Sequence, residues 1–183
     1  GPDPLSVTPT QRMPATTILL IDDDPADRAL AALVLRQGVR GAQLLEAGDS
    51  LGFARHLSAG GFQVAVAEQS LAWGDGVEAL RLVRERYPEV LCVVLSREAA
   101  TPWPAEGEPP AGAVLRKDSA GYLELPRAVT RQVSEARSRG RCAELDGVFE
   151  RLPGGLLLLD GEARVTRANT AAGEILGREP GAL

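Results

Sequence analysis

The feature that most constrains the fold is a run of four branched apolar residues, Ile18–Ile21, that stops abruptly at three carboxylates, Asp22, Asp23 and Asp24. A short apolar run bounded by a turn signal is typical of a buried strand in a parallel sheet. The carboxylates would then lie at the carboxyl end of the strand, where open α/β sheets bind ligands. Because adjacent anions repel one another, we expect a cation here. Mg²⁺ fits, since one or two carboxylates with waters and phosphate oxygens usually hold it.

Helical and strand patterns alternate along the following hundred or so residues. Asp24 with Pro25 matches an N-cap followed by proline at the first helical position, which is an alternative role for Asp24 but leaves Asp22 and Asp23 unexplained. Amphipathic helices are expected at 26–37, from a cap at Asp49 or Ser50 to Gly60, and before Pro88; further strands are expected at 42–47, 62–67, 90–95 and 113–116. This alternation predicts an α/β fold with a doubly wound, five-stranded parallel sheet.

Polar residues that carry chemistry follow the expected strands at their carboxyl ends. Asp22 and Asp23 follow the first strand, Glu68 the third, Ser96 the fourth and Lys117 the fifth. One such placement is common by chance, whereas five on one edge of a sheet is a specific signal. We therefore expect a functional site at this edge.

Composition excludes several classes of function. The net charge of −5 and the lack of a basic block disfavour nucleic-acid binding, and an aromatic content of 4% disfavours a base-stacking platform. The two cysteines and the single histidine have no zinc-ligand spacing, so a zinc site is not expected. The use of only two cysteines, in different settings, favours a reducing, cytoplasmic compartment. Apolar runs fall short of the roughly 20 residues that span a bilayer, so no membrane partner is expected.

The remaining segments suggest a four-part organisation. Residues 1–15 resemble a disordered leader or tag remnant, and 16–124 form the core of the first domain. Within that core, the proline-rich stretch 97–112 replaces a helix. Residues 125–152 form a connector helix whose apolar stripes favour a parallel homodimer. Residues 153–183 begin a second, truncated domain.

Residues 16–135 resemble the receiver domain of bacterial response regulators, the CheY-like family with a flavodoxin-like fold. The resemblance implies that Asp22 and Asp23 hold Mg²⁺, and that the backbone carbonyl of Ser70 reaches the same metal. It further implies that Ser96 and Lys117 contact a phosphoryl group. The family's loop before the third helix is matched by Asp75-Gly76.

The departures from this family are informative. Glu68 stands where the family's phospho-accepting aspartate is expected, and the resemblance implies that this position also contributes a ligand to the metal. Compared with aspartate, the extra methylene of glutamate moves the carboxylate outward by about 1.5 Å. Because a misplacement of about 1 Å can cost about 100-fold in rate, Glu68 is a poor nucleophile. Val114 replaces the switch aromatic, and Asp118 replaces the proline after the lysine.

Three interpretations of Glu68 remain open. Glu68 mimics the phosphorylated state by pairing with Lys117 and Ser96, or the switch is lost and the domain is a fixed dimerisation or docking module, or Glu68 is an unpaired surface acid. With Val114 and the fourth helix both altered, we favour the fixed module.

Residues 147–183 resemble the opening of a PAS sensor domain, with a lead-in at 149–155, strands at 156–160 and 165–169, and a helix beginning at Thr170. This α+β segment lacks the elements of a ligand pocket, so the resemblance assigns no cofactor. Because some 37 residues cannot bury an adequate core, we expect the segment to be incompletely folded or packed on a neighbouring chain.

We therefore expect a non-enzymatic module of two-component signalling: an atypical receiver that acts without phosphorylation and is joined by a helix to a PAS domain. A histidine kinase or an output domain is the expected partner. One alternative is a working receiver that accepts phosphate from a histidine kinase. Another is a phosphohydrolase of the haloacid-dehalogenase type, because Asp22-Asp23-Asp24 has that family's Asp-x-Asp spacing.

Overall fold

The computed structural model describes residues 15–98 and 112–177. The chain divides into two compact units, 1–133 and 134–183. The predicted leader, apart from Ala15, lies outside the described residues, as does most of the proline-rich stretch 97–112.

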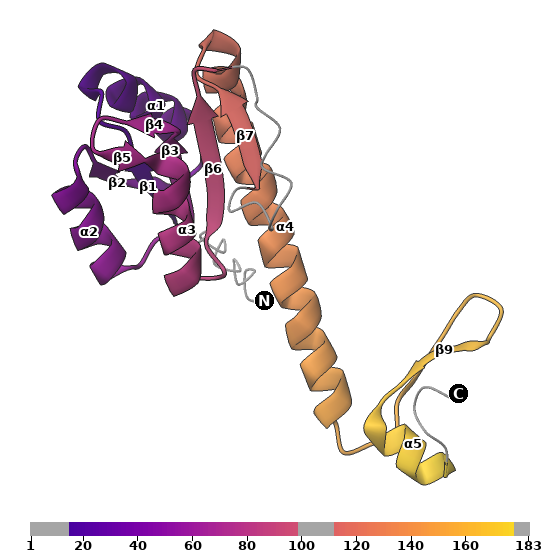
Figure 1. The fold of residues 1–183 in the computed structure, drawn as a ribbon. Helices are drawn as coiled ribbons and strands as arrows, with labels where there is room; N and C mark the ends of the chain where they lie inside the picture. Colours follow the sequence, from indigo (N-terminus) through magenta and orange to yellow (C-terminus); the bar gives the residue numbers. More distant parts are fainter. Residues whose placement is uncertain (1–14, 99–111, 178–183) are drawn as a thin grey trace, which may run out of the picture. The chain divides into compact units, whose positions relative to one another are not determined.

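The first unit contains a five-stranded parallel sheet, which confirms the predicted fold class (Figure 1). The strands are β1 (Thr16–Ile21), β2 (Ala42–Ala47), β3 (Val64–Glu68), β6 (Leu91–Ser96) and β7 (Ala113–Arg116), in the order β2-β1-β3-β6-β7. All five residues of β3 are buried, because this central strand has helices on both faces of the sheet. Parallel pairing aligns the carboxyl ends of the strands along one edge.

Helices α2 (Ser50–Ala59) and α3 (Gly76–Arg86) cover one face of the sheet, and α1 (Pro25–Gly38) and the start of α4 (Ser119–Arg151) cover the other. Alternate residues of β1 supply the two cores, because successive side chains of a strand point to opposite faces. Leu19 packs in the core that includes Leu80 of α3. Leu20 packs in the core that includes Val129 of α4.

Helix caps fix the chain around the sheet edge. Asp24 is the N-cap of α1 and accepts hydrogen bonds from the N–H groups of Ala26 and Asp27, which confirms its alternative role. Asp49 caps α2. Between β3 and α3 lies a small antiparallel hairpin of β4 (Ser70–Leu71) and β5 (Gly74–Asp75).

The long helix α4 begins at Ser119, six residues before the predicted start at Leu125. The Asp118 carboxylate accepts a hydrogen bond from the N–H of Gly121, so the residue that replaces the expected proline holds the first turn. The helix contains Pro126, whose ring lies so close to Gly38 that a Cβ there would come within 2.4 Å of it. Glycine at the end of α1 therefore permits the two helices to pack closely.

The second unit combines the end of α4 with a hairpin, β8 (Leu157–Leu159) and β9 (Val165–Ala168), and a short helix α5 (Thr170–Leu176). The predicted strand, turn, strand and helix are all present. Asn169 joins them: its amide donates to the carbonyl oxygens of Phe149 and Gly154, and its side-chain oxygen accepts from the N–H groups of Leu156 and Ala172.

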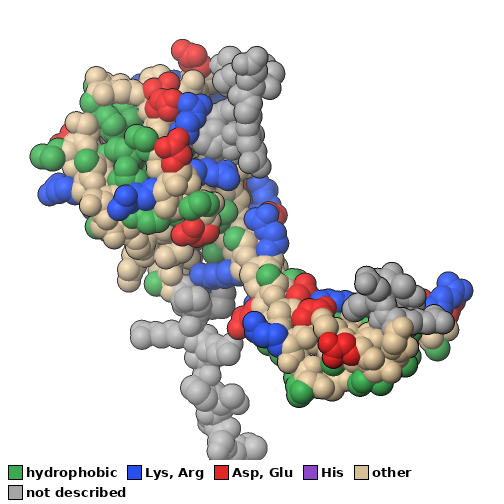
Figure 2. Space-filling model, turned by 60° about the horizontal axis from the view of Figure 1, so that its bottom comes forward, with side chains coloured by type: hydrophobic (Ala, Val, Ile, Leu, Met, Phe, Trp, Pro, Cys, Tyr) green, Lys and Arg blue, Asp and Glu red, His purple; other side chains and the backbone are tan. Residues whose placement is uncertain are grey.

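Large apolar side chains remain exposed on this second unit, among them Leu145, Val148, Leu152, the four leucines 156–159, Ile175 and Leu176. On the face of the molecule drawn in Figure 2, charged side chains of both signs are interspersed. Within the described ranges, no helix is long and apolar enough to cross a membrane.

Candidate functional site

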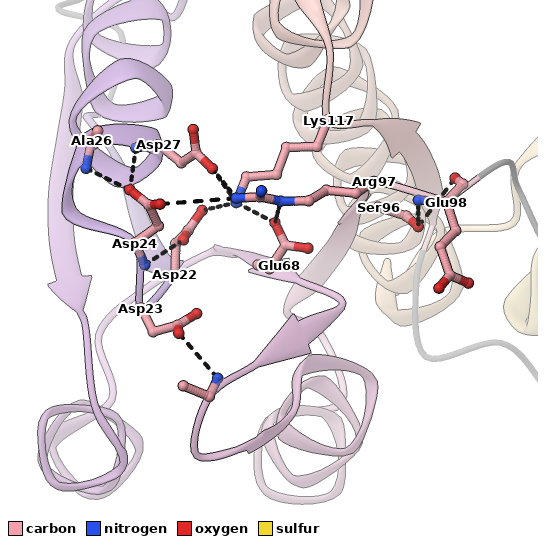
Figure 3. Close-up of polar contacts among 11 residues, drawn as sticks. Asp22, Asp23, Asp24, Ala26, Asp27, Glu68, Ser96, Arg97, Glu98 and Lys117 are labelled. Atoms are coloured by element: carbon pink, nitrogen blue, oxygen red, sulfur yellow. Dashed lines mark hydrogen bonds and ion pairs between the residues drawn. The ribbon is translucent and has the colours of Figure 1, made fainter.

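The carboxyl edge of the sheet holds a buried cluster of ionised side chains (Figure 3). Asp22 follows β1, Glu68 ends β3 and Lys117 follows β7, and the strand order brings all three together. Asp22 is 0% and Glu68 2% exposed. These three residues therefore lie together at the edge of the sheet where the sequence pattern placed them.

Lys117 is the centre of the cluster. Its Nζ atom lies 2.8 Å from Oδ2 of Asp22 and 2.9 Å from Oδ2 of Asp27, and it also pairs with Oε2 of Glu68. Its side chain is 2% exposed. Burial alone would lower the pKa of the ammonium, but its contacts with Asp22, Asp27 and Glu68 outweigh burial and raise the pKa above the ordinary 10.5. Lys117 is thus a permanent buried cation.

Asp22 is held from several sides. Its Oδ1 atom accepts a hydrogen bond from the N–H of Asp24 (3.0 Å), and its backbone carbonyl accepts one from Arg28 (2.6 Å). Burial nevertheless raises the pKa of the Asp22 carboxyl above 3.8, against the opposing effect of Lys117. Removing Lys117 would therefore leave Asp22 with a strongly penalised charge.

Two members of the cluster were not predicted from the sequence: Asp27 and Arg97. Asp27 lies in the first turn of α1, and Arg97 directly follows β6. Arg97 pairs with Asp27 and lies 4.0 Å from carboxylate oxygens of both Asp24 and Glu68, as drawn in Figure 3. The sequence gives no specific signal for Asp27, because an acid in the first turn of a helix is common.

The other predicted residues surround the cluster without joining its ion pairs. The Ser96 hydroxyl exchanges hydrogen bonds with the backbone of Glu98. Asp23 accepts a hydrogen bond from the N–H of Ala72 (3.0 Å). Ser70 belongs to β4 and pairs in register with Asp75. A cavity of about 300 Å³ is lined by Asp23, Asp24, Glu68, Ser70, Ser96, Arg97, Glu98 and Lys117.

Gly76 makes this geometry possible on the β3 side. A Cβ at Gly76 would lie 1.8 Å from the carbonyl oxygen of Glu68, which no side chain can do. The N–H of Gly76 donates to the carbonyl of Gln69, closing the hairpin loop beside the cluster. The Asp75-Gly76 pair therefore sets how closely α3 approaches the end of β3.

No protein-family model matches the chain, and no curated protein matches it. Solved structures do. A CheY-like response regulator receiver domain protein from Methanospirillum hungatei JF-1 aligns over 69% of this chain and 99% of its own, with a TM-score of 0.59 and 17% identity. The fold is that of a receiver domain.

Two further receiver structures give the same result. The signal receiver domain of an HD domain-containing protein from Pseudomonas fluorescens Pf-5 matches 68% of this chain and 99% of its own, with a TM-score of 0.58 and 18% identity. The response regulator TrrA from Thermotoga maritima, solved in complex with Mg²⁺ and BeF, matches 64% of this chain and 98% of its own, with a TM-score of 0.56 and 17% identity. At these identities the likeness concerns the fold.

The receiver fold raises the question of a metal ion at Asp22, Asp23, Glu68 and Ser70. Mg²⁺ requires near-octahedral oxygen ligands at about 2.0–2.1 Å. Here Asp22 and Glu68 face the Lys117 ammonium, and one oxygen of Asp23 accepts a backbone hydrogen bond. Among residues 15–98 and 112–177, no group of three acidic, histidine or cysteine side chains is arranged to hold a metal. The side chains in this arrangement do not fit Mg²⁺.

Proposed function

We propose that the first unit, from Thr16 to Val133, is an atypical receiver module of two-component signalling that regulates its partners without being phosphorylated. The observation that carries this proposal is the buried pair of Glu68 and Lys117, two side chains that are each 2% exposed. Glu68 stands at the end of β3, the place of the phospho-acceptor in the receiver family, and its carboxylate is committed to a cation. The extra methylene of Glu68 displaces its carboxylate from the position of an aspartate carboxylate, which makes Glu68 a poor nucleophile toward a phosphodonor.

The pair also resembles part of a phosphorylated site. A phosphoryl group carries about −1.5 to −2 charges and three acceptor oxygens, so one carboxylate reproduces it only in part. Glu68 contacts Lys117, whereas Ser96 is hydrogen-bonded to Glu98 instead. Val114, at the position of the switch aromatic, is 41% exposed. These features favour a fixed docking or dimerisation module over a permanently activated switch.

The two alternative functions make different demands on the carboxylates of this edge. A phosphohydrolase of the haloacid-dehalogenase type needs free carboxylates two residues apart, but Asp22 pairs with Lys117 and Asp24 caps α1. A receiver that accepts phosphate from a histidine kinase needs a free carboxylate facing the cavity. Asp23 lines that cavity, which makes this second alternative the one to test.

The proposal extends to the rest of the chain. Helix α4 would connect the receiver to a PAS-like second unit, and a histidine kinase or an output domain in the cytoplasm would be the partner. Val129 and Val133 pack in the core of the first unit, so they are not available to a second chain. Leu145, Val148 and Leu152 are 67%, 45% and 41% exposed and would form the contact of a parallel homodimer.

The test is incubation of the protein with Mg²⁺ and acetyl phosphate, followed by measurement of the intact mass. Wild type should remain unmodified. Glu68→Asp is the matched variant, because it restores the family's acceptor while keeping the charge. If it gains one phosphoryl group, only the acceptor has been lost; if it stays unmodified, the site is closed to phosphate altogether. Phosphorylation of the wild type would refute the proposal.

A further inference from the structure

We infer that the ammonium of Lys117 is the resident cation of this site and takes the place of a divalent metal, so that the wild-type receiver binds no Mg²⁺ at its acidic edge. The inference deepens the proposed function and rests on the same cluster. It concerns which cation neutralises the carboxylates, and it can fail independently of whether Glu68 accepts phosphate.

The first support is the number of carboxylates around the ammonium. An ammonium has three N–H groups and no acceptor. Three carboxylates surround it, from Asp22 after β1, Asp27 in α1 and Glu68 at the end of β3. Asp27 completes this set from a helix, so the cation is enclosed on the side of α1 as well as by the sheet. An Mg²⁺ ion bound to the Asp22 oxygen that faces Nζ would lie within about 5 Å of this ammonium and be repelled by it.

The second support is the choice of residue. Lys117 is the only lysine in the sequence, and all the other members of the Lys and Arg total of 20 are arginines. An ammonium is a compact point charge on a flexible stem, whereas a guanidinium is a planar fork suited to bidentate contacts. A compact cation fits between three converging carboxylates. The position between these carboxylates carries that lysine.

The third support is that the neighbouring carboxylates are already engaged. Oxygens of Asp23 and Asp24 accept backbone hydrogen bonds, from Ala72 for the first and from Ala26 and Asp27 for the second. Arg97 supplies a second positive charge, paired with Asp27 and 4.0 Å from Glu68. Two side chains of the protein itself, Lys117 and Arg97, therefore supply positive charge at the acidic edge.

The single lysine provides a direct probe. In protein labelled with ¹³C,¹⁵N-lysine, one set of side-chain resonances reports on Lys117. Titration with Mg²⁺ to about 10 mM, against NaCl of the same ionic strength, should leave these resonances and the thermal midpoint where the NaCl control places them. A saturable shift of the Lys117 resonances, or stabilisation by Mg²⁺ beyond the salt control, would overturn the inference.

Lys117→Met supplies the positive test. This variant keeps the length of the stem but leaves Asp22, Asp27 and Glu68 without their cation. Mg²⁺ should now stabilise the protein. If the dissociation constant is about 1 mM and Mg²⁺ is added to about 10 mM, the ratio of folded to unfolded protein rises roughly tenfold. Arg116→Met is the matched control, because Arg116 pairs with Asp118 and is 62% exposed, and it should show no metal response.

Each outcome decides the question. A folded Lys117→Met that gains nothing from Mg²⁺ beyond the control would mean that the ammonium does not occupy a cation position, against the inference. A variant that folds only with Mg²⁺ supports it. If the variant folds in neither buffer, the wild-type resonances decide as described. Phosphorylation of the wild type would refute the proposed function, whereas metal binding by the wild type would refute this inference.

Discussion

The coupling between Lys117 and Glu68 should be large enough to measure by a double-mutant cycle. The variants are Lys117→Met, Glu68→Met and the double variant, each studied without divalent metal. Lys117→Met leaves Glu68 and Asp22, which are 2% and 0% exposed, with no buried cation. Breaking a buried ion pair by removing one partner costs about 3–5 kcal/mol, because the remaining charge is uncompensated.

Glu68→Met should cost less, about 1.5–3 kcal/mol, since Lys117 keeps Asp22 and Asp27 as partners. In the double variant the loss of the ammonium no longer strands a carboxylate at the end of β3. The cost of Lys117→Met should therefore fall by about 1–3 kcal/mol in the Glu68→Met background. This difference is the coupling energy of the pair.

Urea unfolding, followed by far-UV circular dichroism and tryptophan fluorescence, gives each free energy. For a slope of about 2 kcal/mol per M, the Lys117→Met midpoint should fall by roughly 2 M. Arg116→Met serves as the control, and its exposed pair with Asp118 should contribute at most about 1 kcal/mol. Costs that simply add, with a coupling below about 0.5 kcal/mol, would refute the argument that Lys117 compensates Glu68.

Three further predictions concern other residues. Burial raises the pKa of the Asp22 carboxyl above 3.8, so the folded protein binds this proton more tightly than the unfolded chain does. The stability that this proton contributes is complete below pH 3.8 and is lost as the pH rises through the raised pKa. Asp22→Asn should remove this pH dependence from urea titrations at a series of pH values. Burial raises the pKa of the Cys92 thiol to about 12, so iodoacetamide should modify Cys142 alone in the native protein and both cysteines in urea, as read by peptide mass. Asn169→Ala should destabilise the second unit by about 1–3 kcal/mol, because its backbone partners lose their hydrogen bonds; hydrogen exchange at Leu156 and Ala172 that stays as slow as in wild type would contradict this.

Local patterns in the sequence were sufficient for the sheet and for the core of the site. A short run of apolar residues indicates a buried strand, and apolar residues that recur every 3.6 positions indicate a helix. The five strands could therefore be predicted from short stretches of the sequence. In a parallel sheet the carboxyl ends of the strands lie along one edge, so the sequence alone predicts that Asp22, Glu68 and Lys117 lie close together.

Features that depend on packing between distant segments were beyond those patterns. The start of α4 at Ser119 depends on the Asp118 cap, and the close approach of Pro126 to Gly38 involves a residue of another helix. The hairpin of β4 and β5 is only two residues long on each side, which is too short to produce a periodic signal. Asp27 lies in the first turn of a helix, where acidic residues are common, so its position does not indicate a role in the site.

The sequence by itself determined the alternation of strands and helices, and with it the set of polar residues at one edge, because these follow from hydrophobic periodicity and chain direction. Only the tertiary structure decided which carboxylates share the one buried ammonium. That choice depends on where the first turn of α1 places Asp27 and on the reach of Lys117 across two strands, and both are set by packing between elements far apart in the chain.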